Sequence, residues 1–458
     1  MASRAAGPVT ETGEPGRVGE SLDEGDPAVE QEPAAPARGL AALVRAHAVD
    51  TTPMRHQQYR RLLIGQGTAF IGSMLTQVAV PVQVYAISKS SLYVGLVGLA
   101  GFVPIVLFGL YGGAVADAVD RRKLYFWSSV ITWLVTLALL AQTVLQLDSV
   151  ALILVLVVIQ SAGFATASSA RGAIIPRIVP LAEVPAANTL NFTVGNVGQV
   201  VGPLIAGVLV SLSRGFVYSY TADAVLFTAA LYSALRLPAI EPDGLRQRPG
   251  FRSVIDGLAF IASRPVLVMS FAVDLIAMIF AMPRSLFPQL AADRFHGSVG
   301  LLYAAIPIGS VLAGLSSGWI GRVRRQGVTL TLAIVGWGLC VAFSGLARQL
   351  WLVLVLLALA GAADLVSAVF RQTILQTYAP DELRGRMQGV FTAVVAGGPR
   401  LGDVRAGAMA ATTGISIAWV GGGVACAVLV LLAGVAVRPF WHYDAGKNLV
   451  PADAATET

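Results

Sequence analysis

Residues 171 to 207, RGAIIPRIVPLAEVPAANTLNFTVGNVGQVVGPLIAG, align without a gap with residues 371 to 407, RQTILQTYAPDELRGRMQGVFTAVVAGGPRLGDVRAG. The alignment pairs one arginine, one proline and three glycines of each segment: Arg171 with Arg371, Pro180 with Pro380, Gly198 with Gly398, Gly202 with Gly402 and Gly207 with Gly407. A second pair, GGAVADAVDRRK at 112 to 123 and SSGWIGRVRRQ at 316 to 326, has almost the same offset. The chain is therefore predicted to consist of two related halves.

The composition around this repeat is that of a membrane protein. Of 458 residues, 55% are hydrophobic and 13% charged, and the mean hydropathy is +0.71. A membrane-spanning helix needs about 20 predominantly apolar residues, whereas a spanning strand shows about ten residues of strict alternation. The sequence has long apolar runs without that alternation, so we predict an all-α integral membrane protein.

Twelve apolar runs predict twelve transmembrane helices, at 62 to 87, 92 to 116, 124 to 146, 150 to 170, 188 to 211, 217 to 236, 265 to 290, 298 to 320, 327 to 346, 350 to 371, 388 to 412 and 415 to 437. The longest internal gap separates them into two pseudo-symmetric bundles of six. The predicted organisation is a disordered tail, a first bundle, a linker, a second bundle and a C-terminal tail, at 1 to 58, 59 to 236, 237 to 264, 265 to 437 and 438 to 458. Duplicated halves of this kind place a substrate site at their interface.

Orientation follows from the basic residues between the runs. Sixteen follow the even-numbered helices: Arg121, Arg122, Lys123, Arg171, Arg177, Arg236, Arg246, Arg248, Arg252, Arg264, Arg322, Arg324, Arg325, Arg371, Arg384 and Arg386. Only four follow the odd-numbered ones: Lys89, Arg214, Arg294 and Arg348. Because cytoplasmic loops carry the excess of Lys and Arg, both termini are predicted to be cytosolic, in a multi-pass protein of the cytoplasmic membrane.

Several other classes of function are disfavoured. The net charge of +6 comes from short gaps between apolar runs, which indicates orientation and lipid contact instead of nucleic-acid binding. The sequence has no G-x-x-x-x-G-K-[ST] phosphate loop, and its four histidines, His47, His56, His296 and His442, lack ligand spacing. Cys340 and Cys426 each lie in an apolar run. We expect no enzyme activity, no cofactor and no metal site, and a monomeric protein.

The segment GGAVADAVDRRK resembles the loop motif of the major facilitator superfamily through Gly113, Asp117, Arg121 and Arg122. In that interpretation the four residues form a cytosolic latch between the halves, because Asp117 can accept hydrogen bonds from a helix N-terminus and the arginines can bridge to acids or phosphates. Ala118 and Asp120 depart from the motif. The alternative is ordinary positive-inside charge, which explains the arginines alone.

GQVVGPLIAG, at 198 to 207, is similar to the helix 5 motif of the superfamily's exporters through Gly198, Gly202, Pro203 and Gly207. Ordinary close helix packing is the alternative. Further segments, including VAVPVQVY at 78 to 85 and LQTYAPDELRGRMQGV at 375 to 390, are similar to the enterobactin-exporter branch and its multidrug-like relatives. That resemblance implies a proton-driven exporter of siderophores, drugs or other amphipathic small molecules.

The eleventh run contains three charges, Arg400, Asp403 and Arg405. Arg400 lies about 18 Å from the cytosolic start of the helix, near the centre of a core about 30 Å thick. Arg400 and Asp403 can share one helix face and pair, whereas Arg405 needs another partner. The sequence predicts proton coupling by one of four buried acids, Asp403, Asp274, Asp364 or Asp223, and anion recognition by Arg400. A structural ion pair between helices 7, 10 and 11 is the alternative.

Neutral polar residues in the first half, Gln77, Gln160, Asn191 and Asn196, are further candidates for substrate contact or for polar helix packing. Taken together, the sequence predicts a secondary active transporter that exports a small molecule by proton antiport and alternating access. The alternatives are a proton symporter that imports a solute, and a membrane receptor or scaffold that transports nothing.

Overall fold

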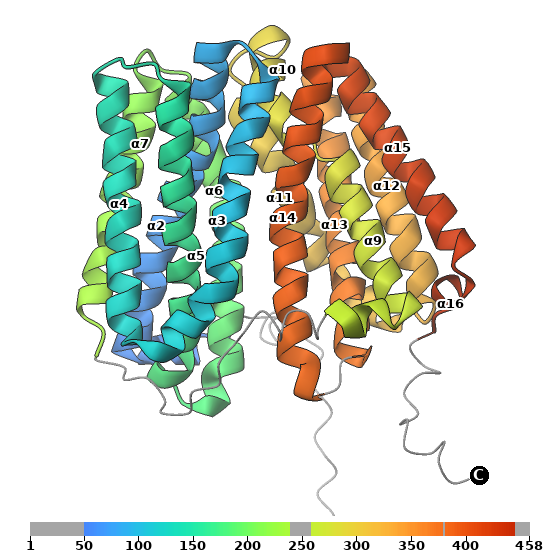
Figure 1. The fold of residues 1–458 in the computed structure, drawn as a ribbon, viewed down its shortest axis with the longest axis horizontal. Coiled ribbons are helices and arrows are strands. Elements are labelled where there is room, and N and C mark those ends of the chain that lie inside the picture. The colour runs from blue at the N-terminus through green and yellow to red at the C-terminus, as the bar shows by residue number, and fades with distance from the viewer. Residues whose placement is uncertain (1–49, 239–257, 379–380, 445–458) are drawn as a thin grey trace, which may run out of the picture. The chain divides into compact units, whose positions relative to one another are not determined.

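The computed structural model describes residues 50 to 238, 258 to 378 and 381 to 444, and within these ranges every regular element is a helix. The helices form two groups side by side (Figure 1). The first group contains α2 (Gln57–Ser88), α3 (Ser91–Ala118), α4 (Arg121–Val144), α5 (Val150–Ile178), α6 (Val184–Val210) and α7 (Gly215–Leu235). The second contains α9 (Pro265–Phe280), α10 (Phe287–Asp293), α11 (Val299–Leu315), α12 (Gln326–Leu346), α13 (Leu350–Tyr378), α14 (Asp381–Thr413) and α15 (Ile415–Ala436). Short helices are η1 (Thr52–Arg55), η2 (Leu181–Glu183), η3 (Arg284–Leu286), η4 (Ser317–Arg322) and α16 (Arg438–Trp441).

Each of the twelve predicted runs lies mainly on a helix. In the described ranges, nine helical stretches are long and apolar enough to cross a membrane, and α11 is a shorter apolar helix of 17 residues. The remaining two predicted spans are α7 and α14, and α14 owes its lower hydropathy partly to the charges in its middle. The membrane fold is therefore all-helical and arranged in two bundles.

Two predicted helices are interrupted. The run at 265 to 290 is continuous in hydropathy, but α9 ends at Phe280 and is followed by η3 and α10. Pro283 precedes η3 and Pro288 lies in the first turn of α10, and proline lacks the backbone donor that would continue a helix. The run at 298 to 320 likewise ends as an α-helix at Leu315 and continues as η4.

The predicted tails and linker fall largely outside the described residues, which omit 1 to 49, 239 to 257 and 445 to 458. Residues 258 to 262, at the end of the predicted linker, are helical. After the second bundle, Phe440 is fully buried and Tyr443 is 2% exposed. The folded part thus extends a few residues past the predicted boundary at 437.

Of the basic residues expected in loops, Arg171, Arg177 and Arg371 instead lie within long helices, and Arg121, Arg122 and Lys123 form the first turn of α4. Arg171 and Arg177 lie in α5, and Arg371 lies in α13, about two turns before its end. Arg371 is only 5% exposed. Without Arg171, Arg177 and Arg371 the bias in basic charge is thirteen against four, so the predicted orientation does not depend on these three residues.

The repeated glycines pack in equivalent ways in the two halves. A Cβ built on Gly198 would lie 2.6 Å from Phe70 Cδ1 of α2, and one built on Gly398 would lie 2.9 Å from Met278 Cβ of α9. Gly202 contacts Met74 of α2 in the same manner. Each helix therefore packs on the first helix of its own half through residues that lack a side chain.

The third glycine of each copy joins the two halves. A Cβ on Gly207 of α6 would lie 2.6 Å from Gly300 Cα, in the first turn of α11. Gly407 of α14 has Ser91, at the start of α3, as its nearest neighbour. The structure thus contains two crossings between the halves, α6 with α11 and α14 with α3, related by the sequence repeat.

Candidate functional site

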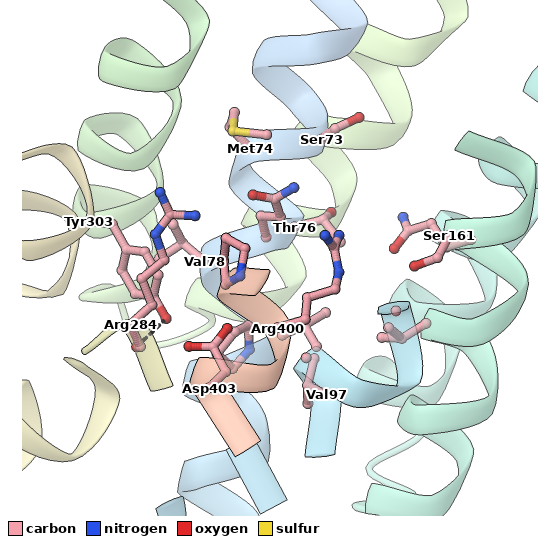
Figure 2. A pocket seen from close by; sticks show the side chains of 18 of the residues that line it. Ser73, Met74, Thr76, Val78, Val97, Ser161, Arg284, Tyr303, Arg400 and Asp403 are labelled. Carbon is pink, nitrogen blue, oxygen red and sulfur yellow. Dashed lines mark hydrogen bonds between the residues drawn. The ribbon is translucent and has the colours of Figure 1, made fainter. Parts of the chain in front are cut away.

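A cavity of about 290 Å³ lies between the two halves (Figure 2). Helices α2 to α6 line it from the first half, and η3, α11 and α14 line it from the second. Apolar side chains are mixed with a small polar set that includes Gln77, Gln160, Ser161, Gln199, Arg284, Tyr303, Arg400 and Asp403. A partly apolar pocket with a few convergent polar groups is the usual form of a small-molecule site.

The charged side chains of the cavity come from the second half. Arg400 and Asp403 lie one turn apart on α14, and Figure 2 shows both at the cavity, with Arg284 and Tyr303 on one side and Ser161 on the other. Asp403 Oδ1 accepts a hydrogen bond of 3.0 Å from the backbone N–H of Ser285. Two guanidinium groups and one carboxylate give the cavity a net positive charge, which suits an anionic group.

Arg284 reaches the cavity because the proline-flanked break after α9 places η3 there. The Tyr303 hydroxyl of α11 donates to the Arg284 carbonyl oxygen at 3.2 Å, which holds η3 against the neighbouring helix. Arg284 was not among the residues predicted from the sequence, because it lies inside an apolar run. The signal that could have revealed it is an arginine enclosed by Pro283 and Pro288 in a predicted span.

Three glycines of α3 allow α14 to approach closely beside the cavity. A Cβ on Gly95 would lie 2.6 Å from the Asp403 carbonyl oxygen, and one on Gly98 would lie 3.3 Å from Asp403 Oδ2. A Cβ on Gly101 would lie 3.2 Å from Arg400 Nε. The spacing of three residues places these glycines along one stripe of α3, a role that was not predicted from the sequence.

The neutral candidates divide into two pairs. Gln77 and Gln160 line the cavity, so their contact with a substrate stays a prediction. Asn191 and Asn196 of α6 are not among its lining residues, and the Asn191 side chain donates to the Ala187 carbonyl of its own helix at 3.0 Å. For Asn191 the packing interpretation fits the structure better than ligand contact.

Arg405 finds its partner at the end of α9. Its Nε donates to the Ile279 carbonyl at 3.1 Å and its Nη2 to the Phe280 carbonyl at 2.5 Å, while Nη1 lies 3.4 Å from the Ala418 carbonyl oxygen. The last carbonyls of a helix have no partner within the helix and carry the negative end of its dipole. Arg405 therefore caps α9 and links it to α15.

Asp274 and Asp364 share Arg371 and do not line the cavity. Asp274 of α9 forms an ion pair with Arg371 of α13, and the two side chains are 3% and 5% exposed. Asp364 Oδ1 lies 3.7 Å from Arg371 Nη2, and its side chain is 31% exposed. Neither acid is a lining residue of the cavity. The second half thus contains a buried ion pair, but it joins α9 to α13 through Arg371 and involves neither Arg400 nor Asp403.

Asp223 is the fourth predicted acid, and it is buried inside the first half. Its side chain on α7 accepts hydrogen bonds from Thr76 of α2, at 2.5 Å, and from Thr136 of α4, at 3.3 Å. Asp223 does not line the cavity, but Thr76 does.

The predicted latch residues lie at helix ends. Gly113 and Asp117 belong to α3, although Asp117 was expected just beyond the end of its span. The surroundings of both residues lie outside the described part of the structure. Asp120, which departs from the family motif, caps α4 by accepting from the Arg122 N–H. Arg122 Nη2 donates to the Leu235 carbonyl of α7, within its own bundle, and Arg121 is 7% exposed. A role between the halves stays a prediction.

An all-helical membrane protein with two repeated halves and a polar cavity between them has the architecture of a secondary transporter. Residues 48–453 match the family described as transmembrane secretion effector, and the chain belongs to this family of the major facilitator superfamily. It is 30% identical over 365 residues to the enterobactin exporter EntS of Shigella boydii serotype 18, covering 78% of this chain and 86% of that protein.

Solved structures share the fold. The nucleoside transporter NupG has a TM-score of 0.67 at 16% identity, covering 84% of this chain and 99% of that chain. A bacterial homologue of the iron transporter ferroportin, in an inward-facing state, has a TM-score of 0.65 at 14% identity, covering 84% and 98%. The chain is thus a multi-pass membrane transporter of the major facilitator fold.

Proposed function

We propose that this protein exports a small amphipathic molecule with an anionic group, such as a siderophore, across the cytoplasmic membrane in exchange for protons. The observation that carries the proposal is the cavity between the halves, where Arg284, Arg400 and Asp403 meet an otherwise largely neutral lining. The named relative, an enterobactin exporter, supports the cargo class and the direction. The bundles at 59 to 236 and 265 to 437 rock about this cavity to give alternating access.

The proposed orientation has both termini in the cytosol. In that orientation the crossing at Gly207 and Gly300 lies at the outer end of the cavity, together with a hydrogen bond of 2.7 Å from Ser91 Oγ to Gln289 Oε1 across the halves. These contacts support a conformation that is closed toward the outside. The proposed transporter acts as a monomer in contact with lipid, without a nucleic-acid partner.

Coupling is assigned to Asp403. For antiport, the cargo must bind the ionised carboxylate, so that proton and cargo compete for one position. A cargo hydroxyl that donates to Asp403 while its anionic group binds Arg284 and Arg400 meets this condition. The charge of Asp403 has the opposite effect on cargo affinity. Protonation of Asp403 removes a negative charge from the cavity and therefore strengthens the binding of an anionic group to Arg400. Because this effect favours the binding of proton and cargo together, proton symport is the second candidate function.

The sign of the pH-gradient effect decides between the two. In everted vesicles with an acidic interior, an antiporting exporter accumulates cargo and loses it when an ionophore collapses the gradient. A symporter instead moves solute out of the same vesicles with the protons. Vesicles without the protein are the control, and a panel of siderophores and dyes serves as probes. The absence of flux for the whole panel would support a receptor or scaffold.

A further inference from the structure

Asp223 occupies an unusual position for a carboxyl group. It is 1% exposed, in the interior of the first bundle between α7, α2 and α4. Gly72 of α2 makes room for it, since a Cβ there would lie 2.6 Å from Asp223 Oδ1. Any larger residue at this point of α2 would displace the carboxyl group, so the site is shaped to hold it.

The groups that face Asp223 are uncharged. Its described neighbours are the hydroxyls of Thr76 and Thr136, and none of the ion pairs among the described residues includes it. The titratable neighbour on its own helix is Tyr220, whose hydroxyl donates to Gln83 Oε1 at 2.7 Å. Asp223 Oδ1 has no hydrogen-bond partner in the described part of the chain.

This environment contrasts with that of the other buried acids. Asp274 has Arg371, and Asp403 shares the cavity with Arg400 and Arg284. A buried carboxylate without a cation costs several kcal/mol relative to one that is paired, whereas a protonated carboxyl group avoids most of that cost. Among the four predicted acids, Asp223 is therefore the one whose surroundings favour a bound proton.

Two hydrogen-bonded routes connect the carboxyl group to the cavity. Thr76 lines the cavity and bonds directly to Asp223 Oδ2 at 2.5 Å. Gln160 also lines the cavity, and its Nε2 lies 3.4 Å from Thr136 Oγ1, which in turn bonds to Asp223. The Asp223 carboxyl group is thus separated from the cavity by the Thr76 hydroxyl and does not itself line the cavity.

We propose that Asp223 is a second proton-binding site, which exchanges its proton with the cavity through the hydroxyl of Thr76. A hydronium ion in the cavity gives a proton to Thr76 Oγ1 while the Thr76 hydroxyl proton moves to Asp223 Oδ2, so two O–H bonds break, two form, and neutral water is left in the cavity. Thr76 ends the step unchanged. The role of this site in coupling rests on the proposed proton antiport, in which Asp403 carries the proton that competes with cargo.

Infrared difference spectra of the purified full-length protein, recorded between alkaline and acidic pH without cargo, test the proton site directly. In wild type, the carbonyl band of protonated carboxyl groups should contain a component that disappears in Asp223→Asn. Thr76→Val should shift this component, because the hydrogen bond to Oδ2 is lost, without removing it. A spectrum of Asp223→Asn identical to that of wild type at every pH would overturn the proposal.

A matched control is Thr68→Val on the same helix, since the Thr68 hydroxyl bonds to the Ile64 and Gly65 carbonyls of α2 itself. The component assigned to Asp223 should be unaffected there. A second measurement is the ratio of protons to cargo in proteoliposomes, which should fall by one in Asp223→Asn. An unchanged ratio would refute the coupling role. If no cargo moves at all, the antiport proposal fails, and the infrared arm still decides the proton site.

Discussion

The buried ion pair of Asp274 and Arg371 holds α9 against α13. Replacing either residue alone is predicted to lower the free energy of unfolding substantially. Both side chains are at most 5% exposed, so either substitution leaves a charge in a low-dielectric interior. Breaking such a pair costs about 3–5 kcal/mol. The cost of Asp274→Asn should lie toward the lower end of this range, because Asp364 remains 3.7 Å from the Arg371 guanidinium. Arg371→Gln should lie toward the upper end, because it leaves Asp274 without a cation.

The double variant Asp274→Asn with Arg371→Gln should be more stable than Arg371→Gln alone. It removes both charges and keeps two side chains of similar shape that can share a hydrogen bond. We expect a coupling free energy of about 3 kcal/mol in the cycle, which corresponds to roughly a hundredfold in the unfolding equilibrium. The free energy of unfolding in mixed micelles of increasing denaturing detergent measures each variant.

The same double variant distinguishes a structural role of the ion pair from a role in proton coupling. If the pair only holds the helices, pH-driven transport should return with stability in the double variant. Additive losses in the cycle would refute the ion-pair account of this site. A stable double variant that exchanges cargo but has lost uphill transport would show instead that Asp274 takes part in coupling.

Three further substitutions test the latch, the crossing and the cap. Asp117→Asn should reduce transport in whole cells at unchanged membrane abundance, since it removes a charged acceptor without changing shape; normal transport at equal abundance would count against the latch. Gly207→Leu should block the cycle or make the protein leaky in a liposome flux assay, because Gly300 occupies the space, and full coupled activity would contradict the crossing. Arg405→Gln should lower the melting temperature without altering the proton-to-cargo ratio, because it leaves the last carbonyls of α9 without their cation; a changed ratio would contradict the capping role.

Much of the fold was predictable because hydropathy and the repeat report it directly. The pairing of Gly207 with Gly407 came from sequence, and in the structure each glycine joins its helix to the opposite half. The break after α9 was harder to predict, since Pro283 and Pro288 interrupt the helix without interrupting the apolar run. Hydropathy measures transfer into lipid and is insensitive to the loss of one backbone donor.

The candidate site was predicted in part. Arg400 and Asp403 lie at the cavity because their spacing of three places them on one face of a helix. Arg371 was assigned to a loop because a basic residue at the end of an apolar run has the same signature whether it faces the cytosol or a buried acid. The partners of Arg405 are backbone carbonyl groups, and every residue has one, so the sequence does not indicate which of them a buried arginine contacts.

Asp403 is proposed to couple cargo to protons in a cavity whose arginines bind the cargo. The most direct measurement compares cargo exchange with pH-gradient-driven accumulation in proteoliposomes that contain Asp403→Asn. We predict that exchange persists and accumulation is lost, because a neutral amide at position 403 leaves no proton that competes with cargo for the cavity. The double variant Arg400→Gln with Asp403→Asn should also fail to accumulate cargo. Uphill transport by that double variant at the normal rate would contradict the account.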